Sequence, residues 1–544
     1  MSQRIDSVLF AGMLRSGASS LAKEKTTINE LNVFPIPDGD TGDNMYMTLK
    51  AGCDTAGGVT GSLSEIASAA AEGMLLGARG NSGVILSRIF AGLAKGLKDV
   101  QEADTAAFAA SMTSAVKEAY SAIPTPVEGT IITVLREGAE GAEADSSLEH
   151  YFETLLSAMN TSLEHTPDKL AVLRETGVVD SGGAGLVCIF RGMDSALRGD
   201  APAAEEISEA PAAAHLDLGK FTEDSTLEFG YCTELLLRLT RAKCDIEHFD
   251  LQALISFLES RGNSVVAFRE GSIVKIHVHT FRPGEILDHC QQWGEFLTVK
   301  IENMTLQHHQ ESNAGNASLR RPRQKFGIVT VVAGSGLEDV FRQIGCDAII
   351  CGGQTMNPST EQFLEAFESI NADTILVFPN NSNIIMAAEQ AAGLYKKADV
   401  RIIRSTSIGE GYYGIASVDR DSSDTDAVVE AVYAAMDSVT CATVARAIRD
   451  AEGVDGLAVA KGDYVGYVGK NILCDAPGRT EACTALCSKL GAGERDVLLI
   501  FYGKDVPEAE AAALQATLQQ SYPMLEIMLN HGNQPVYDYI FVLC

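Results

Sequence analysis

The stretch NVFPIPDGDTGDNM, residues 32–45, carries the sharpest signal in this chain of 544 residues. An apolar, proline-marked approach runs into Asp38, Gly39 and Asp40, and a third carboxylate follows at Asp43. Neighbouring carboxylates repel one another unless a cation lies between them, and the glycine allows a tight turn on which two of them can converge. Oxygen ligands of this kind suit Mg²⁺, which commonly bridges to substrate phosphates. The alternative is a turn with solvated side chains, and an EF-hand is disfavoured because the loop lacks the Glu twelve positions on.

Three glycine-rich loops stand at expected helix starts in the same part of the chain: GARGNSGVILS (77–87), PVEGTIITVLREGAEGA (126–142) and TGVVDSGGAGLV (176–187). Such a turn presents free N–H groups and the positive end of the helix dipole to an anion. None of them is a Walker A motif, and each alone is more often a helix cap. Together with the tri-acidic loop, they predict a ring of loops around a Mg²⁺-nucleotide.

Composition narrows the class of protein. The formal charge is −31, from 42 basic and 73 acidic side chains, which argues against a general binder of nucleic acid or anionic membranes. No run of about 18 apolar residues and no signal-peptide pattern occur. The 12 cysteines are spread like reduced cytosolic thiols. We therefore expect a cytoplasmic protein with no integral membrane segment and no nucleic-acid partner.

The length predicts about three domains. Two stretches lack hydrophobic periodicity and are interpreted as linkers, one rich in Ala, Pro and Glu at 201–219 and one polar at 308–325. They separate three blocks, 1–200, 220–307 and 326–544.

Each block has its own hydrophobic pattern. The first carries Ala, Leu and Met at a spacing of three to four, as in SLSEIASAAAEGMLLGARG (62–80), and predicts helices. The second alternates strands such as SIVKIHVHT (272–280) with a helix, and predicts a small α+β domain. The third alternates strand-like and helical runs, which predicts a mostly parallel, doubly wound sheet. The predicted fold class is multidomain α and α/β.

Several motifs support a resemblance to known families. LNVFPIPDGDTGDNM, GARGNSGVILS, VEGTIITVLREG and VVDSGGAGL resemble the nucleotide-binding domain of the dihydroxyacetone kinase L family. HVHT, GGQTMNPST, PNNSNI and HGNQPVYDYI extend the resemblance over almost the whole chain, to the ATP-binding components of two-component bacterial fatty acid kinases. It implies an N-terminal all-helical barrel that carries ATP or ADP on two Mg²⁺ ions, and a C-terminal region similar to DegV proteins.

The resemblance also implies roles for individual residues. Asp38 and Asp40 match the aspartate pair that holds the ions, and a third ligand position falls near Asn32, a weaker neutral ligand. Asp43 is expected to make at most a water-mediated contact. Arg79 is a candidate catalytic cation, although a surface helix-cap arginine is an equal alternative. Nucleotide contacts are expected from Thr41, Asn44, Gly80, Asn81, Ser82, Gly83, Thr130, Asp180 and Gly182.

The implied reaction is phosphorylation of a fatty-acid carboxylate that a separate fatty-acid-binding protein presents, giving acyl phosphate. A carboxylate with a pKa of about 4–5 is already ionised at neutral pH, so no general base is required. Catalysis then depends on positioning and on neutralising charge. The alternatives are a kinase of small hydroxyketones such as dihydroxyacetone, and a non-enzymatic lipid-binding or regulatory protein. We expect a homodimer.

His277 and His279 stand two apart on an expected strand, so both leave the same face of the sheet. Cys232 begins the preceding strand of the same block and is a candidate soft ligand. Cys/His/His suits Zn²⁺, and the family resemblance supports such a site. The alternative is a pair of histidines buried in the core with satisfied hydrogen bonds.

In the third block, CGGQTMNPSTEQF (351–363) and FPNNSNIIMAAEQ (378–390) each place a polar loop between a strand and a helix. This is the usual ligand position in an open α/β sheet. The alternative is helix capping with Asx turns. We interpret the block as a docking or regulatory domain. The polar candidates are Thr355, Asn357, Ser359, Asn380, Asn381 and Asn383.

Overall fold

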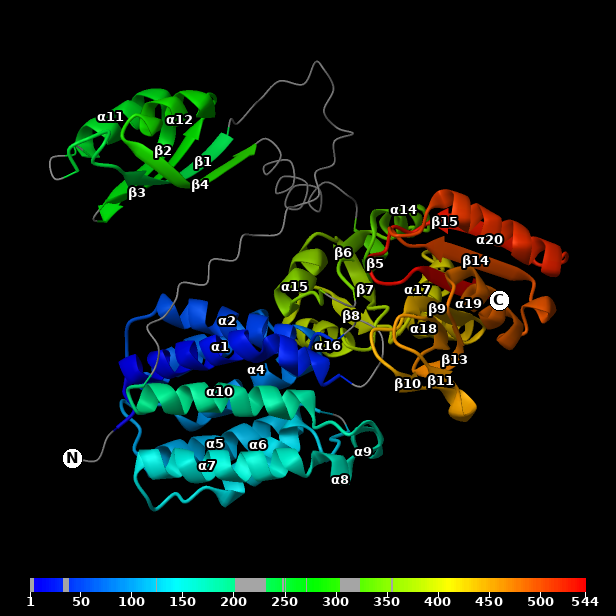
Figure 1. Cartoon of the computed structure of the whole chain (residues 1–544), viewed down its shortest axis with the longest axis horizontal. Helices are drawn as coiled ribbons and strands as arrows, with labels where there is room; N and C mark the ends of the chain where they lie inside the picture. The colour runs from blue at the N-terminus through cyan, green and yellow to red at the C-terminus, as the bar shows by residue number, and fades with distance from the viewer. Residues whose placement is uncertain are drawn as a thin grey trace. The chain divides into compact units, whose positions relative to one another are not determined.

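The computed structural model describes residues 4–32, 39–123, 125–200, 231–246, 249, 251–270, 272–303, 323–353 and 356–544. The chain folds into two compact units, one formed by Met1–Glu206 together with Arg323–Cys544 and the other by Ile207–Pro322 (Figure 1). The first and third blocks of the sequence therefore belong to one unit, although the second block separates them along the chain.

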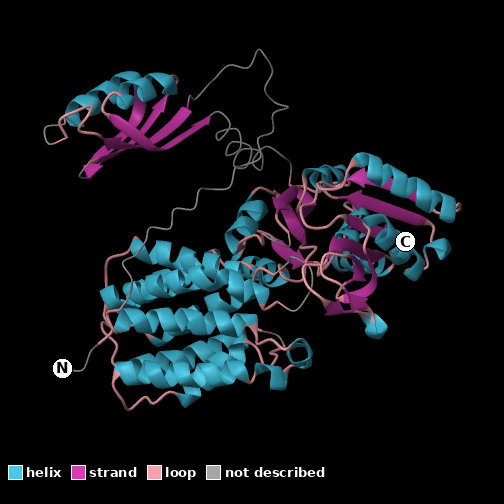
Figure 2. Cartoon of the chain, in the orientation of Figure 1, coloured by secondary structure: helices cyan, strands magenta, loops and turns pink. Residues whose placement is uncertain are grey.

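The N-terminal part of the first unit is helical throughout its described residues (Figure 2). From α1 to α7 each helix packs against the next, and α10 packs against α1, α6 and α7, so the helices close into a barrel around one apolar core. Side-chain caps fix several helix starts, such as the capping box of Ser62 and Glu65. The helices are α1 (Ser7–Glu30), α2 (Thr41–Gly57), α3 (Leu63–Leu76), α4 (Gly80–Gly96), α5 (Thr105–Ser121), α6 (Ile131–Gly141), α7 (Leu148–Glu164), α8 (Thr166–Lys169), α9 (Ala171–Thr176) and α10 (Ser181–Leu197).

In its described residues, the second unit holds an antiparallel sheet of order β2-β3-β1-β4 and two helices. Leu235, Leu237, Ile276 and Val278 alternate along β1 and β3 and share one apolar cluster with both helices. The elements are β1 (Tyr231–Leu239), α11 (Leu251–Arg261), β2 (Gly262–Glu270), β3 (Ile273–Thr280), α12 (Pro283–Gln291) and β4 (Gly294–Asn303).

The C-terminal part of the first unit begins with a parallel sheet of order β6-β5-β7-β8. β5, β6 and β7 are mostly apolar, as expected for parallel strands covered by helices, whereas the edge strand β8 alternates exposed charged and apolar residues. The elements are β5 (Gln324–Val332), α14 (Ser335–Gln343), β6 (Ala348–Cys351), α15 (Thr360–Glu368), β7 (Ala372–Phe378), α16 (Ile385–Leu394), β8 (Asp399–Ile402), α17 (Ile408–Ala416) and α18 (Thr425–Asp437).

A second sheet of order β13-β12-β9-β16-β14-β15 follows. It is mixed, because only β14 and β15 pair in parallel. The multidomain α and α/β class is confirmed, and the parallel arrangement belongs to the first C-terminal sheet; β10 and β11 form a separate antiparallel pair. The remaining elements are β9 (Thr440–Arg446), β10 (Ala451–Glu452), η2 (Val454–Gly456), β11 (Ala458–Val459), β12 (Tyr464–Val468), β13 (Asn471–Ala476), α19 (Arg479–Lys489), η3 (Ala492–Glu494), β14 (Val497–Tyr502), α20 (Glu508–Ser521), β15 (Glu526–His531) and β16 (Tyr539–Leu543).

Within the first unit, α15 and α16 pack against the helical barrel at α3 and α4. Ala78 and Val84, at the start of α4, are buried in the same apolar cluster as Phe363 and Ile384. Gln390 Nε2 donates to the carbonyl of Leu75 at 2.8 Å. The glycine-rich loop before α4 is therefore covered by the C-terminal part of the chain.

None of the helices in the described part of the chain combines the length and the apolar character that a membrane span requires.

Candidate active site

The N-termini of four helices meet at one end of the barrel. Ser181 Oγ, at the start of α10, donates to Thr41 Oγ1, at the start of α2, at 3.2 Å. Gly80, the first residue of α4, lies so close to α2 that a Cβ there would be 2.5 Å from Asn44 Nδ2. The backbone N–H of Ile131, the first residue of α6, donates to the carboxylate before α10. The positive ends of four helix dipoles thus face one region, which is a site suited to an anion.

Asp40 is the residue that precedes one of these helix starts, that of α2. It is 8% exposed, yet its carboxylate makes no side-chain cap with the helix. Instead its Oδ2 accepts a hydrogen bond of 2.5 Å from Asn357 Nδ2. Asn32 lies beside the same loop, because a Cβ at Gly39 would be 3.2 Å from Asn32 Cβ. Asp38, the other predicted aspartate, lies outside the described residues.

Asp43 has a structural task in this loop. Lys25 Nζ lies 3.0 Å from its Oδ1, and Asn29 Nδ2 donates to its Oδ2 at 2.6 Å. Asn29 also accepts from the backbone N–H of Gly42 at 2.7 Å. These contacts fasten the first turn of α2 to α1, and sequence reasoning missed both Lys25 and Asn29.

The start of α4 is built by Arg79 and Gly80. Gly80 adopts a left-handed backbone with φ of +57°, which favours glycine. The Arg79 N–H donates to Thr48 Oγ1 at 3.2 Å, and its Nη1 donates to the carbonyl of Asn357 at 2.7 Å. Burial lowers the pKa of Arg79, and the neighbouring Glu361 partly offsets this effect. Arg79 is therefore a half-buried residue engaged with the C-terminal part of the chain, rather than a surface cap.

Asp180 shapes the opposite side of the site. Its Oδ2 accepts from the backbone N–H of Gly183 at 2.7 Å, and its own N–H donates to Thr166 Oγ1 at 3.1 Å. Burial raises the pKa of Asp180 from 3.8 to about 6, against the opposing effect of the N–H donors of Gly183 and Ile131. Thr130 precedes α6 and donates to the carbonyl of Val127 at 2.8 Å. Gly182 packs on Ile131, where a Cβ would lie 3.2 Å from the Ile131 Cβ.

We expect the Asp180→Asn variant to remove a pH dependence of stability. Because the pKa of Asp180 is higher in the folded state, the folded protein binds more protons between pH 4 and 6, and stability falls as the pH rises through that window. A shift from 3.8 to about 6 corresponds to at most about 3 kcal/mol. Thermal melting at pH 4.5 and pH 7.5 measures the effect. An unchanged difference between the two pH values in the variant would assign the pH dependence to other groups.

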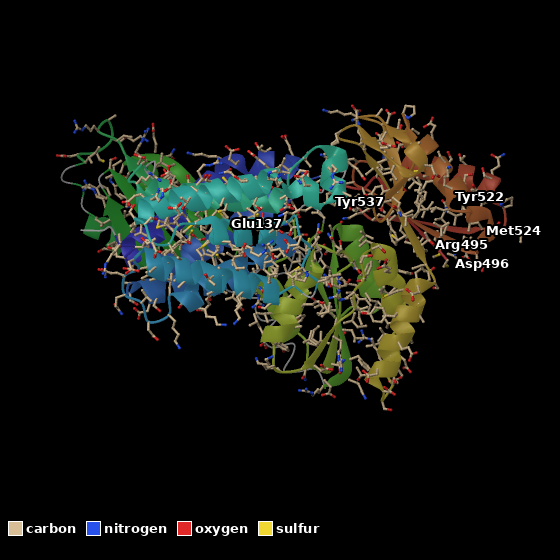
Figure 3. All side chains as sticks on the ribbon, turned by 90° about the horizontal axis from the view of Figure 1, so that it is seen from below. Glu137, Arg495, Asp496, Tyr522, Met524 and Tyr537 are labelled. Atoms are coloured by element: carbon tan, nitrogen blue, oxygen red, sulfur yellow. The ribbon has the colours of Figure 1, made fainter. Side chains whose placement is uncertain are left out.

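A polar network holds the segment that leads to Asp180. Figure 3 shows Glu137 on the helical barrel, where it belongs to α6. Lys169 Nζ and Ser162 Oγ both donate to the Glu137 carboxylate, Ser162 at 2.7 Å. Because Lys169 ends α8 and Thr166 begins it, this network fixes the Thr166 hydroxyl that receives the Asp180 N–H.

The donor set at the barrel end fits a hard cation and phosphate. The Asp40 carboxylate is buried at the start of α2, and the side-chain Oδ1 atoms of Asn81 and Asn357 are buried with no hydrogen-bond partner among the described residues. Buried amide oxygens normally have such partners. Among the residues that the structure describes, no three His, Cys, Asp or Glu side chains gather as a metal site. With Asp38 outside those residues, the aspartate pair as a ligand set stays a prediction.

The predicted zinc ligands lie on the sheet of the second unit. Antiparallel pairing of β1 with β3 places Cys232 directly opposite His279, and Glu234 opposite His277. All four positions share one face, because the alternate positions, such as Leu235 and Val278, belong to the apolar cluster. Only the backbone is described at Cys232, His277 and His279, so the zinc site stays a prediction.

The polar loop residues predicted in the C-terminal part have different structural roles. Ser359 forms a capping box with Gln362 at the start of α15. Asn380, with φ of +58°, hydrogen-bonds to Thr330 and Ser405, and Asn381 accepts from the N–H of Asn383 at 2.9 Å. The contacts of Ser359 and Asn381 agree with the capping and turn interpretation, whereas Asn380 connects residues far apart in the sequence. Asn357 contacts the Asp40 carboxylate at the barrel end, and Thr355 lies outside the described residues.

Three family models match the chain. They describe a DAK2 domain over residues 35–195, the middle domain of FakA-like fatty acid kinase proteins over 228–311, and the C-terminal region of the same FakA-like proteins over 327–543.

Curated relatives match over the full length. Protein YloV of Bacillus subtilis (strain 168) is 36% identical over 552 residues, with 98% of each chain covered. An uncharacterized protein of Staphylococcus aureus (strain MRSA252), SAR1202, is 34% identical over 562 residues, with 99% of this chain and 100% of that one covered. Among solved structures, DegV, a fatty acid binding protein from Bacillus subtilis, aligns with a TM-score of 0.31 at 12% identity over 40% of this chain and 99% of that chain.

Proposed function

The chain belongs to the FakA-like family of fatty acid kinase proteins, and on that basis we propose that it transfers the γ-phosphoryl group of ATP to a fatty-acid carboxylate. The carboxylate is presented by a separate fatty-acid-binding protein, and the products are acyl phosphate and ADP. The observation that supports this proposal best is that the starts of four helices meet at one barrel end, where the Asp40 carboxylate before α2 is buried. We also propose that the reaction takes place in the cytoplasm and that the protein acts as a homodimer.

The helix starts provide the phosphate-binding surface in this proposal. The first residues of α2, α4 and α10 offer backbone N–H groups that no helical carbonyl accepts. Asn44 and Gly83 pack these starts together, since a Cβ at Gly83 would lie 3.3 Å from the Asn44 carbonyl. The proposed nucleotide contacts are Thr41, Asn44, Gly80, Asn81, Ser82, Gly83, Thr130, Asp180 and Gly182.

Asp38 and Asp40 are proposed to hold two Mg²⁺ ions, with Asn32 as a weaker ligand. Bound Mg²⁺ supplies the positive charge that lets two anions, the triphosphate and the fatty-acid carboxylate, approach each other. Asp40 is held by Asn357, and Arg79 adds a cation at the start of α4. The acceptor is ionised at neutral pH, so no side chain has to remove a proton. The protein therefore acts by positioning the triphosphate and the fatty-acid carboxylate and by neutralising their negative charge.

The DAK2 domain match by itself also suits a hydroxyketone kinase. Matches to the middle and C-terminal models of FakA-like fatty acid kinase proteins favour the fatty-acid substrate. The deciding experiment incubates the full chain with Mg²⁺-ATP and a fatty acid, with and without a co-purified fatty-acid-binding protein, and traps acyl phosphate with hydroxylamine. Trapped product only with the binding protein is the expected result. ATP turnover with dihydroxyacetone, and none with partner-bound fatty acid, would contradict the proposal.

We expect one Zn²⁺ per chain, bound by Cys232, His277 and His279 and serving a structural role. Cys232 and His279 occupy paired positions on adjacent strands, and Cys/His ligands suit zinc. Elemental analysis of untagged protein checks this, with Cys232→Ser expected to lose the metal. Cys244→Ser in the same unit is the matched control, because Cys244 Sγ already donates to the Trp293 carbonyl. Zinc retained in Cys232→Ser would refute the site.

A further inference from the structure

Asn357 comes from the C-terminal part of the chain but lies at the end of the helical barrel. It is 1% exposed and follows β6 in the loop that leads to α15. Its Nδ2 donates to Asp40 Oδ2 at 2.5 Å, and its backbone carbonyl accepts from Arg79 Nη1 at 2.7 Å. One residue thus contacts both the metal-loop carboxylate and the arginine before α4.

Backbone contacts fix this placement. Arg79 and Ser359 form an antiparallel bridge, and the N–H of Thr360 donates to the carbonyl of Ala78 at 3.2 Å. At Gly80 the space is so limited that a Cβ would lie 3.0 Å from Asn357 Nδ2. The position of Asn357 therefore follows from backbone pairing at Ser359 and Thr360, which follow it closely in the chain, rather than from one flexible side chain.

Of the two polar atoms of the Asn357 side-chain amide, the nitrogen has a hydrogen-bond partner in the protein. In the part of the chain that the structure describes, the amide Oδ1 is buried without a hydrogen-bond partner, and the same holds for Asn81 Oδ1 in the first turn of α4. A buried amide oxygen normally accepts a hydrogen bond. Two such oxygens without a donor near the start of α4 therefore point to a ligand that supplies hydrogen-bond donors or positive charge. A hydrated Mg²⁺-nucleotide has both.

We propose that Asn357 is a positioning residue of the phosphoryl-transfer site, contributed by the C-terminal part of the same chain. Its Nδ2 holds the Asp40 carboxylate in the orientation that binds the cation, and its Oδ1 gains a partner when Mg²⁺-nucleotide binds. The inference rests on the proposed function, because it assumes that Asp40 holds a cation. It makes nucleotide binding by the helical barrel depend on the docked C-terminal part.

Gln390 offers a matched control for a merely structural role. It is also buried, at 5% exposed. Like Asn357, it joins the C-terminal part to the helical barrel, by donating to the Leu75 carbonyl at 2.8 Å. Its side-chain Oε1 also lacks a partner, so that feature does not distinguish the two residues. The contact with Asp40 does, because none of the hydrogen bonds described for Gln390 reaches it.

The test titrates the full-length chain with the non-hydrolysable analogue AMP-PNP at several Mg²⁺ concentrations, by calorimetry. Removing the partner of a ligand typically costs about 10- to 100-fold in affinity or activity, so Asn357→Ala should weaken AMP-PNP binding by that factor and should need more Mg²⁺ for half-saturation. Gln390→Ala should bind like the wild type. Asn357→Ser, which keeps a polar group too short to reach Asp40, replaces the alanine variant if that one melts below the assay temperature.

Equal losses in Asn357→Ala and Gln390→Ala, or wild-type Mg²⁺ dependence in Asn357→Ala, would overturn the inference and leave a packing role. A wild-type chain that binds no Mg²⁺-AMP-PNP would instead refute the proposed function. The two failures are therefore distinguishable.

Discussion

Replacing Asp40 with asparagine is expected to abolish phosphoryl transfer while leaving the fold intact. The asparagine Oδ1 can still accept the hydrogen bond that Asn357 Nδ2 donates to Asp40 at 2.5 Å, so the variant loses charge rather than packing. Without that charge the cation is held poorly and the triphosphate stays uncompensated. We expect kcat to fall on the order of 10³-fold, or about 4 kcal/mol in transition-state stabilisation. Asp38→Asn should behave in the same way.

Acyl phosphate trapping measures the rate, and circular dichroism with thermal melting checks the fold. Asp54→Asn is the matched control, because Asp54 lies on the same helix, α2, in an exposed ion pair with Lys50 at 3.6 Å. Exposed pairs of this kind contribute little to stability. Wild-type turnover in Asp40→Asn would remove Asp40 from the metal site.

Much of the barrel end could be predicted from the sequence because its signals are local. Asp40, Gly80, Thr130 and Asp180 each stand just before or at the start of an apolar helical run, in a turn rich in glycine or polar residues. Helix starts of this kind depend on a few neighbouring residues. The motifs also predict that these loops form a ring, but the contacts that join the four starts depend on how the helices close into a barrel.

The contact of Asn357 with Asp40 could not be predicted in the same way. It joins residues 317 positions apart, and neither hydrophobic periodicity nor a capping pattern reports such a pair. One signal was available, since Ala78 and Val84 are apolar residues flanking a polar loop, and both are buried by the C-terminal part. Asp43 was likewise ambiguous, because only the fold brings Lys25 and Asn29 of α1 beside it.

The second C-terminal sheet differs from the first for a related reason. Alternating strands and helices up to β8 predict parallel pairing, and the structure has it there. After β9 the strands β12 and β13 are joined by a short turn at Gly469, with φ of +58°, and short connections produce antiparallel neighbours. The length of the connection between two strands therefore indicates whether they pair in parallel or antiparallel.

Gly80→Ala is expected to disable the site by a different route, through geometry rather than charge. The φ of +57° at Gly80 costs an alanine roughly 1–2 kcal/mol. Its Cβ would also lie 2.5 Å from Asn44 Nδ2 and 3.0 Å from Asn357 Nδ2, so both amides have to move. Because small displacements of positioning groups can cost about 100-fold, we expect kcat/KM for phosphoryl transfer to fall by that order.

Gly491→Ala separates the two causes of this effect. Gly491 has a similar φ of +64°, but no atom lies within 4 Å of an added Cβ. The control variant therefore carries the backbone strain alone. Gly491 follows α19 and is far along the chain from the site. Both variants should melt at lower temperature, and only Gly80→Ala should lose activity and AMP-PNP affinity. If Gly80→Ala keeps wild-type kcat/KM while its melting temperature falls like that of the control, the close approach of α4 to Asn44 and Asn357 contributes to stability and not to phosphoryl transfer.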